Sequence, residues 1–242
     1  SGPEGYAYAG EDICISPEAF ETHVRYLVGR YAVLPLPEAV RRISTGEPLP
    51  RNAVSITFDD GYADNLAAAR TLARHGATAT FYITAGCLAD GEPFWPAELR
   101  YLLAGIPDSR VRLGAGPVQF EADVSSPGAR AAAVAALTRT FKSHPIPVRE
   151  ALREELRALA SGVVMPRVML TWDEVREMHR LGMTIASHTM THPNLPSAGL
   201  DAARAELVAS RARLEDEIGA PVTMFSYPNG GAERYLTTEV QG

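Results

Sequence analysis

The sequence predicts an α/β fold with parallel strands, and three observations support this prediction. Residues 54–84 have the pattern of a strand, a helix and a second strand within about 30 residues, the length of one βαβ unit. A similar succession occurs later, with strands expected at 183–187 and 222–227 around a helix at 200–218. Polar residues follow several of these strands, and in parallel sheets and α/β barrels the catalytic groups collect at the carboxyl ends of strands.

The composition indicates an ordinary globular chain. With 242 residues, 46% hydrophobic and 21% charged, it suits a single domain over residues 1–242. The net charge of −6 argues against a nucleic acid or an anionic membrane as partner. Cys14 and Cys87 give neither a disulfide framework nor a paired metal spacing. The oligomeric state is left open.

Nothing in the sequence predicts a membrane-spanning segment, because no run of about 18 apolar residues occurs. The first residues lack the basic and apolar regions of a signal peptide. The bacterial cytoplasm and the cell envelope both remain open as the compartment.

The first elements lead to the central strand. A helix is expected at 17–30, because Ser16 suits the N-cap and Pro17 suits the first helical position. A short strand at 31–36 and a short helix at 37–43 follow.

The central strand is Val54 to Phe58, in which apolar residues alternate with Ser and Thr. It ends in Asp59 and Asp60, and Gly61 then permits a backbone bend. Neighbouring side chains at a strand end point in different directions, so the two carboxylates are expected to have different tasks. The alternative is a turn in which an Asp caps the next helix. A helix at 64–75 and a strand at 79–84 complete the βαβ unit and favour the site.

Residues 95–165 show a different pattern, which we interpret as an insertion packed on the core and not as a second domain. It contains a short helix at 96–103 and a small hairpin, with strands at 111–113 and 118–120 around a Gly-Ala-Gly-Pro turn. Two helices are expected after it, at 128–141 and 148–160.

The later strand at 183–187 ends in His188, and His192 follows four residues on. If this stretch forms one helical turn, both imidazoles leave the same face, about 6 Å apart. Pro193 prevents such a turn from growing. Two histidines and one carboxylate with open positions suit a catalytic metal site better than a closed structural one. The helix before this strand is expected to begin with a capping box, Thr171 and Glu174.

Three stretches, 57–61 (Thr-Phe-Asp-Asp-Gly), 187–193 (Ser-His-Thr-Met-Thr-His-Pro) and 225–230 (Phe-Ser-Tyr-Pro-Asn-Gly), resemble the ordered motifs of the polysaccharide deacetylases, the NodB-homology group or carbohydrate esterase family 4. The resemblance spans roughly residues 12–231. It implies a distorted (β/α) barrel of seven or eight strands. The segment at 93–95 and the insertion are similar to those of members that modify exopolysaccharides or cell-surface glycans.

Carried over by position, the resemblance implies that Asp60, His188 and His192 hold a divalent metal, most often Zn²⁺, with Co²⁺, Ni²⁺ or Mn²⁺ as alternatives. Asp59 would be the catalytic base, and the stretch Tyr227-Pro228-Asn229 would contact the substrate and its oxyanion. The implied activity is hydrolysis of N-acetyl groups on a glycan, with release of acetate. Trp95 either stacks on a sugar ring or packs in the core.

The chain also departs from the family pattern. Ser226 stands where the family usually has an Arg that orients the base, and Asn229 stands where it usually has Tyr. The late Asp-Trp and Leu-x-His motifs have no counterpart. We therefore expect residues to be omitted between about 231 and 236 and after 242, including a general-acid histidine. Two other functions stay open, an O-deacetylase and a catalytically impaired carbohydrate-binding homologue. A non-haem iron oxygenase ranks far behind, because βα alternation does not suit its sandwich fold.

Overall fold

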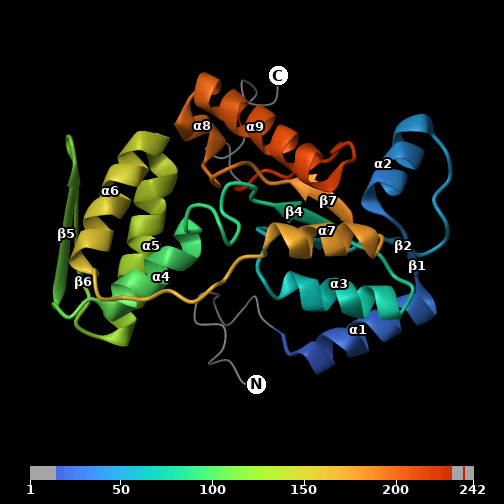
Figure 1. The fold of residues 1–242 in the computed structure, drawn as a ribbon, viewed down its shortest axis with the longest axis horizontal. Helices are drawn as coiled ribbons and strands as arrows, with labels where there is room; N and C mark the ends of the chain where they lie inside the picture. The colour runs from blue at the N-terminus through green and yellow to red at the C-terminus, as the bar shows by residue number, and fades with distance from the viewer. Residues whose placement is uncertain (1–14, 231–236, 238–242) are drawn as a thin grey trace.

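The computed structural model describes residues 15–230 and 237. The molecule is elongated, and Figure 1 shows β5, β6, α4, α5 and α6 at one end and α2 at the other. The described helices are Pro17–Arg30 (α1), Leu36–Thr45 (α2), Asn65–Arg74 (α3), Trp95–Gly105 (α4), Pro127–Ser143 (α5), Ile146–Leu159 (α6), Trp172–Arg180 (α7), Leu195–Ala198 (α8) and Leu200–Ile218 (α9). The described strands are Ala32–Val33 (β1), Ala53–Val54 (β2), Thr57–Phe58 (β3), Thr80–Ile83 (β4), Arg110–Ala115 (β5), Val118–Asp123 (β6) and Thr184–Ser187 (β7).

A parallel sheet with the order β3-β4-β7 forms the centre of the fold. The predicted βαβ unit is confirmed, with α3 connecting β3 to β4. Phe58 and Phe81 are register partners whose rings stack with centroids 4.6 Å apart. They belong to a core that also contains residues of α3, α7 and α9, so these helices bury one face of the sheet. The carboxyl ends of all three strands then meet at one edge.

The predicted central strand is divided between two sheets. Residues Ala53 and Val54 (β2) pair with β1, whereas Thr57 and Phe58 (β3) pair with β4. The Ser55 hydroxyl at the changeover donates to the carbonyl of Leu34, 2.9 Å away. The chain therefore leaves β1 and joins β4 between β2 and β3. The alternation of apolar and polar residues over 54–58 gave no sign of this change. In the described part of the chain the strands form sheets of two, three and two strands, and barrel closure is not shown.

The strand predicted at 222–227 is wrong in extent. Only Phe225 makes a parallel bridge, to Ser187, supported by hydrogen bonds from Ser187 N to Met224 O and from Ser226 N to Ser187 O, both 3.0 Å. Pro228 has no N–H with which to continue a ladder. The predicted omission at about 231–236 lies outside the described residues.

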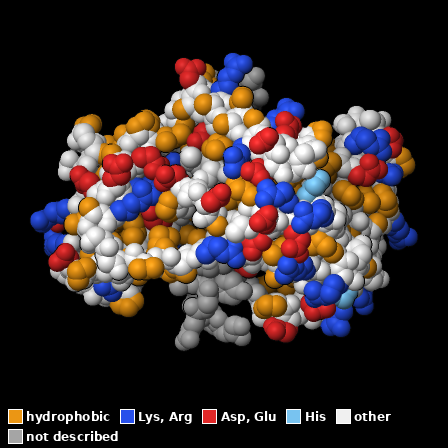
Figure 2. Space-filling model, in the orientation of Figure 1, with side chains coloured by type: hydrophobic (Ala, Val, Ile, Leu, Met, Phe, Trp, Pro, Cys, Tyr) orange, Lys and Arg blue, Asp and Glu red, His pale blue; other side chains and the backbone are white. Residues whose placement is uncertain are grey.

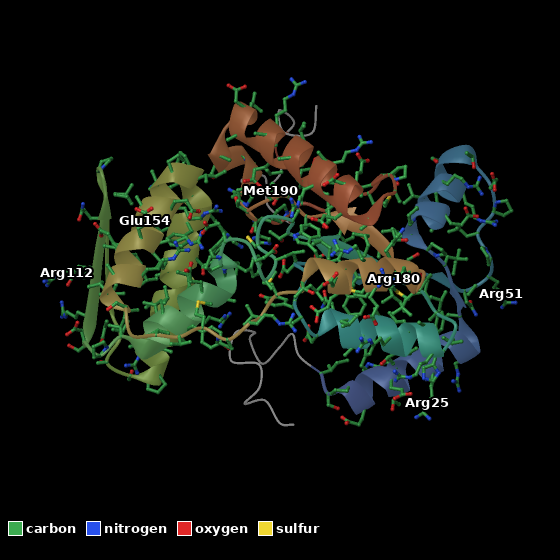
Figure 3. All side chains as sticks on the ribbon, viewed as in Figure 1. Arg25, Arg51, Arg112, Glu154, Arg180 and Met190 are labelled. Carbon is green, nitrogen blue, oxygen red and sulfur yellow. The ribbon has the colours of Figure 1, made fainter. Side chains whose placement is uncertain are left out.

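The predicted insertion has its own hydrophobic core. The hairpin of β5 and β6 is antiparallel as predicted, and α4, α5 and α6 pack against it. Leu137, Leu152 and Leu156 are fully buried at its centre. Whether the chain counts as one domain stays a prediction. Arg112 on the hairpin and Arg51 before β2 lie at opposite ends of the molecule in Figure 3.

The segment after the insertion returns to the central strand, which the sequence did not indicate. Met169 makes an antiparallel bridge to Tyr62, and Leu170 N donates to the carbonyl of Gly61, 3.0 Å away. The predicted capping box then begins α7, with Thr171 and Glu174 each bonded to the backbone of the other. This return supports the turn that follows Asp60.

The surface carries charges of both signs. On the face shown in Figure 2, Lys and Arg side chains are interspersed with Asp and Glu and do not form one large patch. In the part of the chain that is described, no helix is long and apolar enough to cross a membrane.

Candidate metal centre

Asp60, His188 and His192 come together at the carboxyl edge of the sheet. Asp60 follows β3 and His188 follows β7, and both strands are neighbours of β4. The Asp60 Oδ1 atom lies 3.4 Å from His188 Nε2 and 3.3 Å from His192 Nε2. One ligand atom from each residue lies within 4.8 Å of the other two. The histidine side chains are 3% and 9% exposed and that of Asp60 is 24% exposed, so the carboxylate is the part that solvent reaches.

The two imidazoles meet without the helical turn that their spacing suggested. Thr189 and His192 have φ of 69° and 55°, so the loop takes left-handed backbone at two places. The ring centroids are nevertheless 5.1 Å apart. The convergence of the two rings depends on this irregular backbone.

Left-handed backbone is concentrated at this site. Of the four non-glycine residues with positive φ in the described ranges, three are here, Asp60 at 74° together with Thr189 and His192. Such conformations cost about 1–3 kcal/mol each and persist only when the surrounding structure holds them. The site is therefore maintained by its neighbours.

His188 is oriented by a hydrogen bond to backbone. Its Nδ1 lies 2.9 Å from the carbonyl oxygen of Ser226, which can only accept, so Nδ1 carries the proton. Nε2 then faces Asp60: it donates to the carboxylate when the ring is protonated, and it offers its lone pair to a metal when the ring is neutral. Ser226 thus contributes through its carbonyl, independently of its side chain.

His192 is held by its backbone and by packing. Its N–H donates to the Thr189 hydroxyl at 3.1 Å, and its carbonyl accepts from Trp95 Nε1 at 3.0 Å. The ring of Phe94 packs edge-on against the imidazole, with centroids 5.3 Å apart. Trp95 is only 2% exposed, which favours the packing role over a sugar contact.

Electrostatics keep these ligands in the form that binds metal. Burial opposes the charge of Asp60, but hydrogen bonds and charge from the two imidazoles outweigh it and lower the Asp60 pKa. Burial lowers the pKa of His192 below 6.5, although Asp60 opposes this shift. A carboxylate and neutral imidazoles are the ligand forms. Two nitrogens and one oxygen at these separations fit a divalent cation with open positions.

Asp59 has different surroundings. Phe58 faces the core, so the alternation of the strand places Asp59 on the opposite side. The residue is exposed. Partial desolvation nevertheless raises the Asp59 pKa above 3.8, assisted by Asp60 and opposed by the two histidines. Among the described residues its carboxylate has no hydrogen-bond partner. Asp59 is therefore a carboxylate next to the candidate metal ligands that makes no hydrogen bond of its own in the described part of the chain.

The third stretch ends beside the histidine loop. Asn229 is 7% exposed, and its Nδ2 lies 3.4 Å from the carbonyl oxygen of Pro193. Tyr227 is half-buried and packs on Phe225, with ring centroids 4.8 Å apart. The substrate and oxyanion roles of Tyr227, Pro228 and Asn229 stay predictions.

Two buried charged residues near the site were missed. Glu206 and Arg149 both bond to Thr191, between the histidines. Glu206 stands in the buried stripe of α9, which comprises Ala203, Glu206, Ser210 and Leu214. Glu206 could have been noticed in the sequence as a charged residue on the apolar face of a helix. Its partner Thr191 could not be identified, because it lies in the loop after β7.

The comparisons with known proteins agree with this arrangement. The family model of polysaccharide deacetylase matches residues 129–241, which include both histidines. A comparison with curated protein sequences finds no significant match.

Three solved structures are similar in fold. The Streptococcus pyogenes deacetylase PplD, in complex with acetate, is 18% identical with a TM-score of 0.60, covering 100% of this chain and 74% of that one. BC0361, a polysaccharide deacetylase from Bacillus cereus, is 19% identical with a TM-score of 0.54, and the match covers 94% of this chain and 48% of that one. A de-N-acetylase from Aggregatibacter actinomycetemcomitans is 16% identical with a TM-score of 0.55, and the match covers 97% of this chain and 79% of that one.

At these identities the structural likeness supports the α/β fold alone. The family match is a match of sequence, and it includes His188 and His192 but not Asp59 and Asp60. Over residues 129–241, a little under half of the chain, the sequence matches the polysaccharide deacetylase family.

Proposed function

We propose that this chain is a metal-dependent deacetylase that removes N-acetyl groups from the N-acetylhexosamine units of a glycan and releases acetate. The carrying observation is the convergence of Asp60, His188 and His192 beside the separate carboxylate of Asp59. The similar protein from Aggregatibacter actinomycetemcomitans is named a de-N-acetylase, which supports the choice of an amide substrate. We also infer that the parallel strands belong to a distorted barrel of the deacetylase type.

The cation would be held by one carboxylate oxygen and two imidazole nitrogens, a donor set that suits Zn²⁺ and also accommodates Co²⁺, Ni²⁺ or Mn²⁺. When bound, it supplies Lewis acidity and a water of lowered pKa. Asp60 is already ionised and His192 already neutral, so neither needs to lose a proton at neutral pH.

Asp59 is the proposed general base. It accepts a proton from the water as the new C–O bond forms at the acetamide carbonyl. The C–N bond then breaks, and the leaving nitrogen needs a proton, which protonated Asp59 can return. The products are a free amine and acetic acid, which passes its proton to the amine or to water and becomes acetate, so atoms and protons balance. The raised pKa of Asp59 favours this exchange.

The oxyanion that develops at the carbonyl needs a donor. We assign this to backbone N–H in the stretch 227–229, where Pro228 has none and Asn229 has one. Asn229 is anchored beside Pro193, so this donor would sit next to the histidine loop.

Acetate release from defined substrates tests the proposal. Zinc-loaded protein and chelator-treated protein are each incubated with N-acetylglucosamine oligomers and with an O-acetylated polysaccharide, and acetate and free amine are measured. Zinc-dependent release of both from the oligomers is expected. Acetate without amine, from the second substrate alone, would indicate an O-deacetylase. Glycan binding with bound zinc and no acetate would indicate an impaired homologue. No metal binding and no acetate would overturn the proposal.

A further inference from the structure

Thr191, between the two histidine ligands, is held by two buried charged side chains. Arg149 on α6 is 2% exposed. Its Nη1 donates to the Thr191 carbonyl at 3.1 Å, and its Nη2 donates to the Thr191 hydroxyl at 2.9 Å. The guanidinium therefore holds backbone and side chain of one residue together.

Glu206 on α9 holds the other side of this residue and is 7% exposed. Its Oε2 accepts from the N–H of Met190 at 2.7 Å and from that of Thr191 at 2.9 Å. Its Oε1 accepts from the Thr191 hydroxyl at 2.6 Å. The hydroxyl accepts from Arg149 and donates to Glu206, so it connects two buried opposite charges.

The contact between Arg149 and Thr191 joins the insertion to the loop at 188–192, which carries the two histidines. Arg149 Nε is bonded to Glu150 at 2.7 Å, and Glu150 is paired at 2.6 Å with Arg153 of the same helix. Arg153 is paired in turn with Glu98 of α4, at 2.7 Å, and both side chains are nearly fully buried. Met190, labelled in Figure 3, lies where the loop after β7 passes between the insertion and α9. We call Arg149 and Glu206, together with Thr191 between them, the clamp. It connects α6 of the insertion to α9.

Burying a guanidinium and a carboxylate is unfavourable unless each is fully hydrogen-bonded. Here both are bonded to the short segment between two residues of left-handed backbone, Thr189 and His192. We propose that Arg149 and Glu206 are positioning residues that hold this segment in the conformation that points His192 at Asp60. The inference rests on the proposed metal-dependent function.

The physical consequence is a metal site formed before the metal binds. Without the clamp, the loop can relax toward ordinary backbone and turn the imidazole of His192 away. The cation must then reorder the loop on binding, which lowers its affinity. Groups that orient metal ligands typically change affinity about 10- to 100-fold when removed.

Zinc titration calorimetry on the full chain tests the clamp. Arg149→Met removes both donors to Thr191 and retains most of the side-chain volume. We expect zinc to bind about 10-fold more weakly. Leu152→Ala is the matched control, because Leu152 is a fully buried residue of the same helix and of the insertion core. It is expected to lower the melting temperature while leaving zinc affinity within twofold.

Thr191→Val is the second variant, in case Arg149→Met does not fold. It keeps both charged groups and deletes only the bridging hydroxyl, and we expect a smaller loss of affinity of a few fold. Wild-type affinity in Arg149→Met, or in Thr191→Val where the former is unfolded, would overturn the clamp. So would an equal loss in Leu152→Ala. A wild-type chain that binds no zinc would instead overturn the metal site itself, and the clamp with it.

Discussion

Asp59 and Asp60 are adjacent in sequence, yet their surroundings differ in almost every respect. Asp60 is held between two imidazoles and takes left-handed backbone. Asp59 is exposed, and its carboxylate has no hydrogen-bond partner in the described part of the chain. The pKa of Asp60 is lowered and that of Asp59 is raised. In the proposed mechanism this division separates metal binding by Asp60 from proton exchange by Asp59.

The largest effect is expected from removing the Asp60 carboxylate. Asp60→Ala leaves two buried imidazoles without their charged partner and removes one of three ligands. We expect metal content to fall to background and acetate release to disappear with it. Asp60→Asn is the control for backbone strain, because Asn also tolerates the positive φ of this position. If Asp60→Ala retains stoichiometric zinc, the division of roles is wrong.

A second substitution isolates the base. Asp59→Asn keeps the shape of the side chain but cannot accept the proton, so kcat should fall about 10²- to 10⁴-fold while zinc stays bound. Asp108→Asn, an exposed Asp on the insertion, is the matched control and should change neither quantity. Near-normal turnover by Asp59→Asn would remove the base assignment. Measurements of zinc stoichiometry and initial rate decide the matter.

The pH dependence of zinc binding sharpens the same comparison. Metal binding requires neutral His192, whose pKa burial lowers from its usual 6.5. Protonation of His192 therefore competes with zinc when the pH falls through this lowered pKa, and below it affinity should fall at least about tenfold per pH unit. Between pH 8 and 7 the affinity should be constant. A tenfold change already in that upper range, in a buffer that does not bind zinc, would contradict the assignment.

The smallest effect concerns the support of His192 by Trp95. Trp95→Phe keeps an aromatic ring against His192 and removes the donor to the His192 carbonyl. The lost hydrogen bond should cost about 0.5–1.5 kcal/mol of stability. Zinc affinity should fall a few fold, with KM for the glycan unchanged because the ring is buried. A rise in KM at constant zinc affinity would instead favour the sugar contact.

Local signals in the sequence predicted much of this molecule. The capping box of Thr171 and Glu174 was predictable because both partners lie within one turn of helix. The strand ends near Asp60 and His188 were predictable from alternation and from the order of the motifs. In each case the information lies within a few neighbouring residues.

Features that depend on distant partners were not predictable. The spacing of the histidines suits one helical turn after His188, but Thr189 and His192 take left-handed backbone instead. That conformation is supported by Glu206, fifteen residues away from Thr191, and by Arg149, forty-two residues away. The strand expected at 222–227 is reduced to a single bridge between Phe225 and Ser187. The length of a strand depends on hydrogen bonds to a neighbouring strand, which the local sequence does not show.

The left-handed backbone at the site also restricts which residues can occupy it. Asp and His are among the non-glycine residues most often found with positive φ, and they are also common metal ligands. At Asp60 and His192 one side chain therefore meets both requirements. Glutamate could donate the same oxygen at position 60 but lacks this conformational tolerance. Thr189 is the exception, a β-branched residue at φ 69°, and its hydroxyl accepts the N–H of His192. We expect that a library of substitutions selected for zinc binding would retain Asp or Asn at position 60 and would admit glycine at 189 only with looser binding.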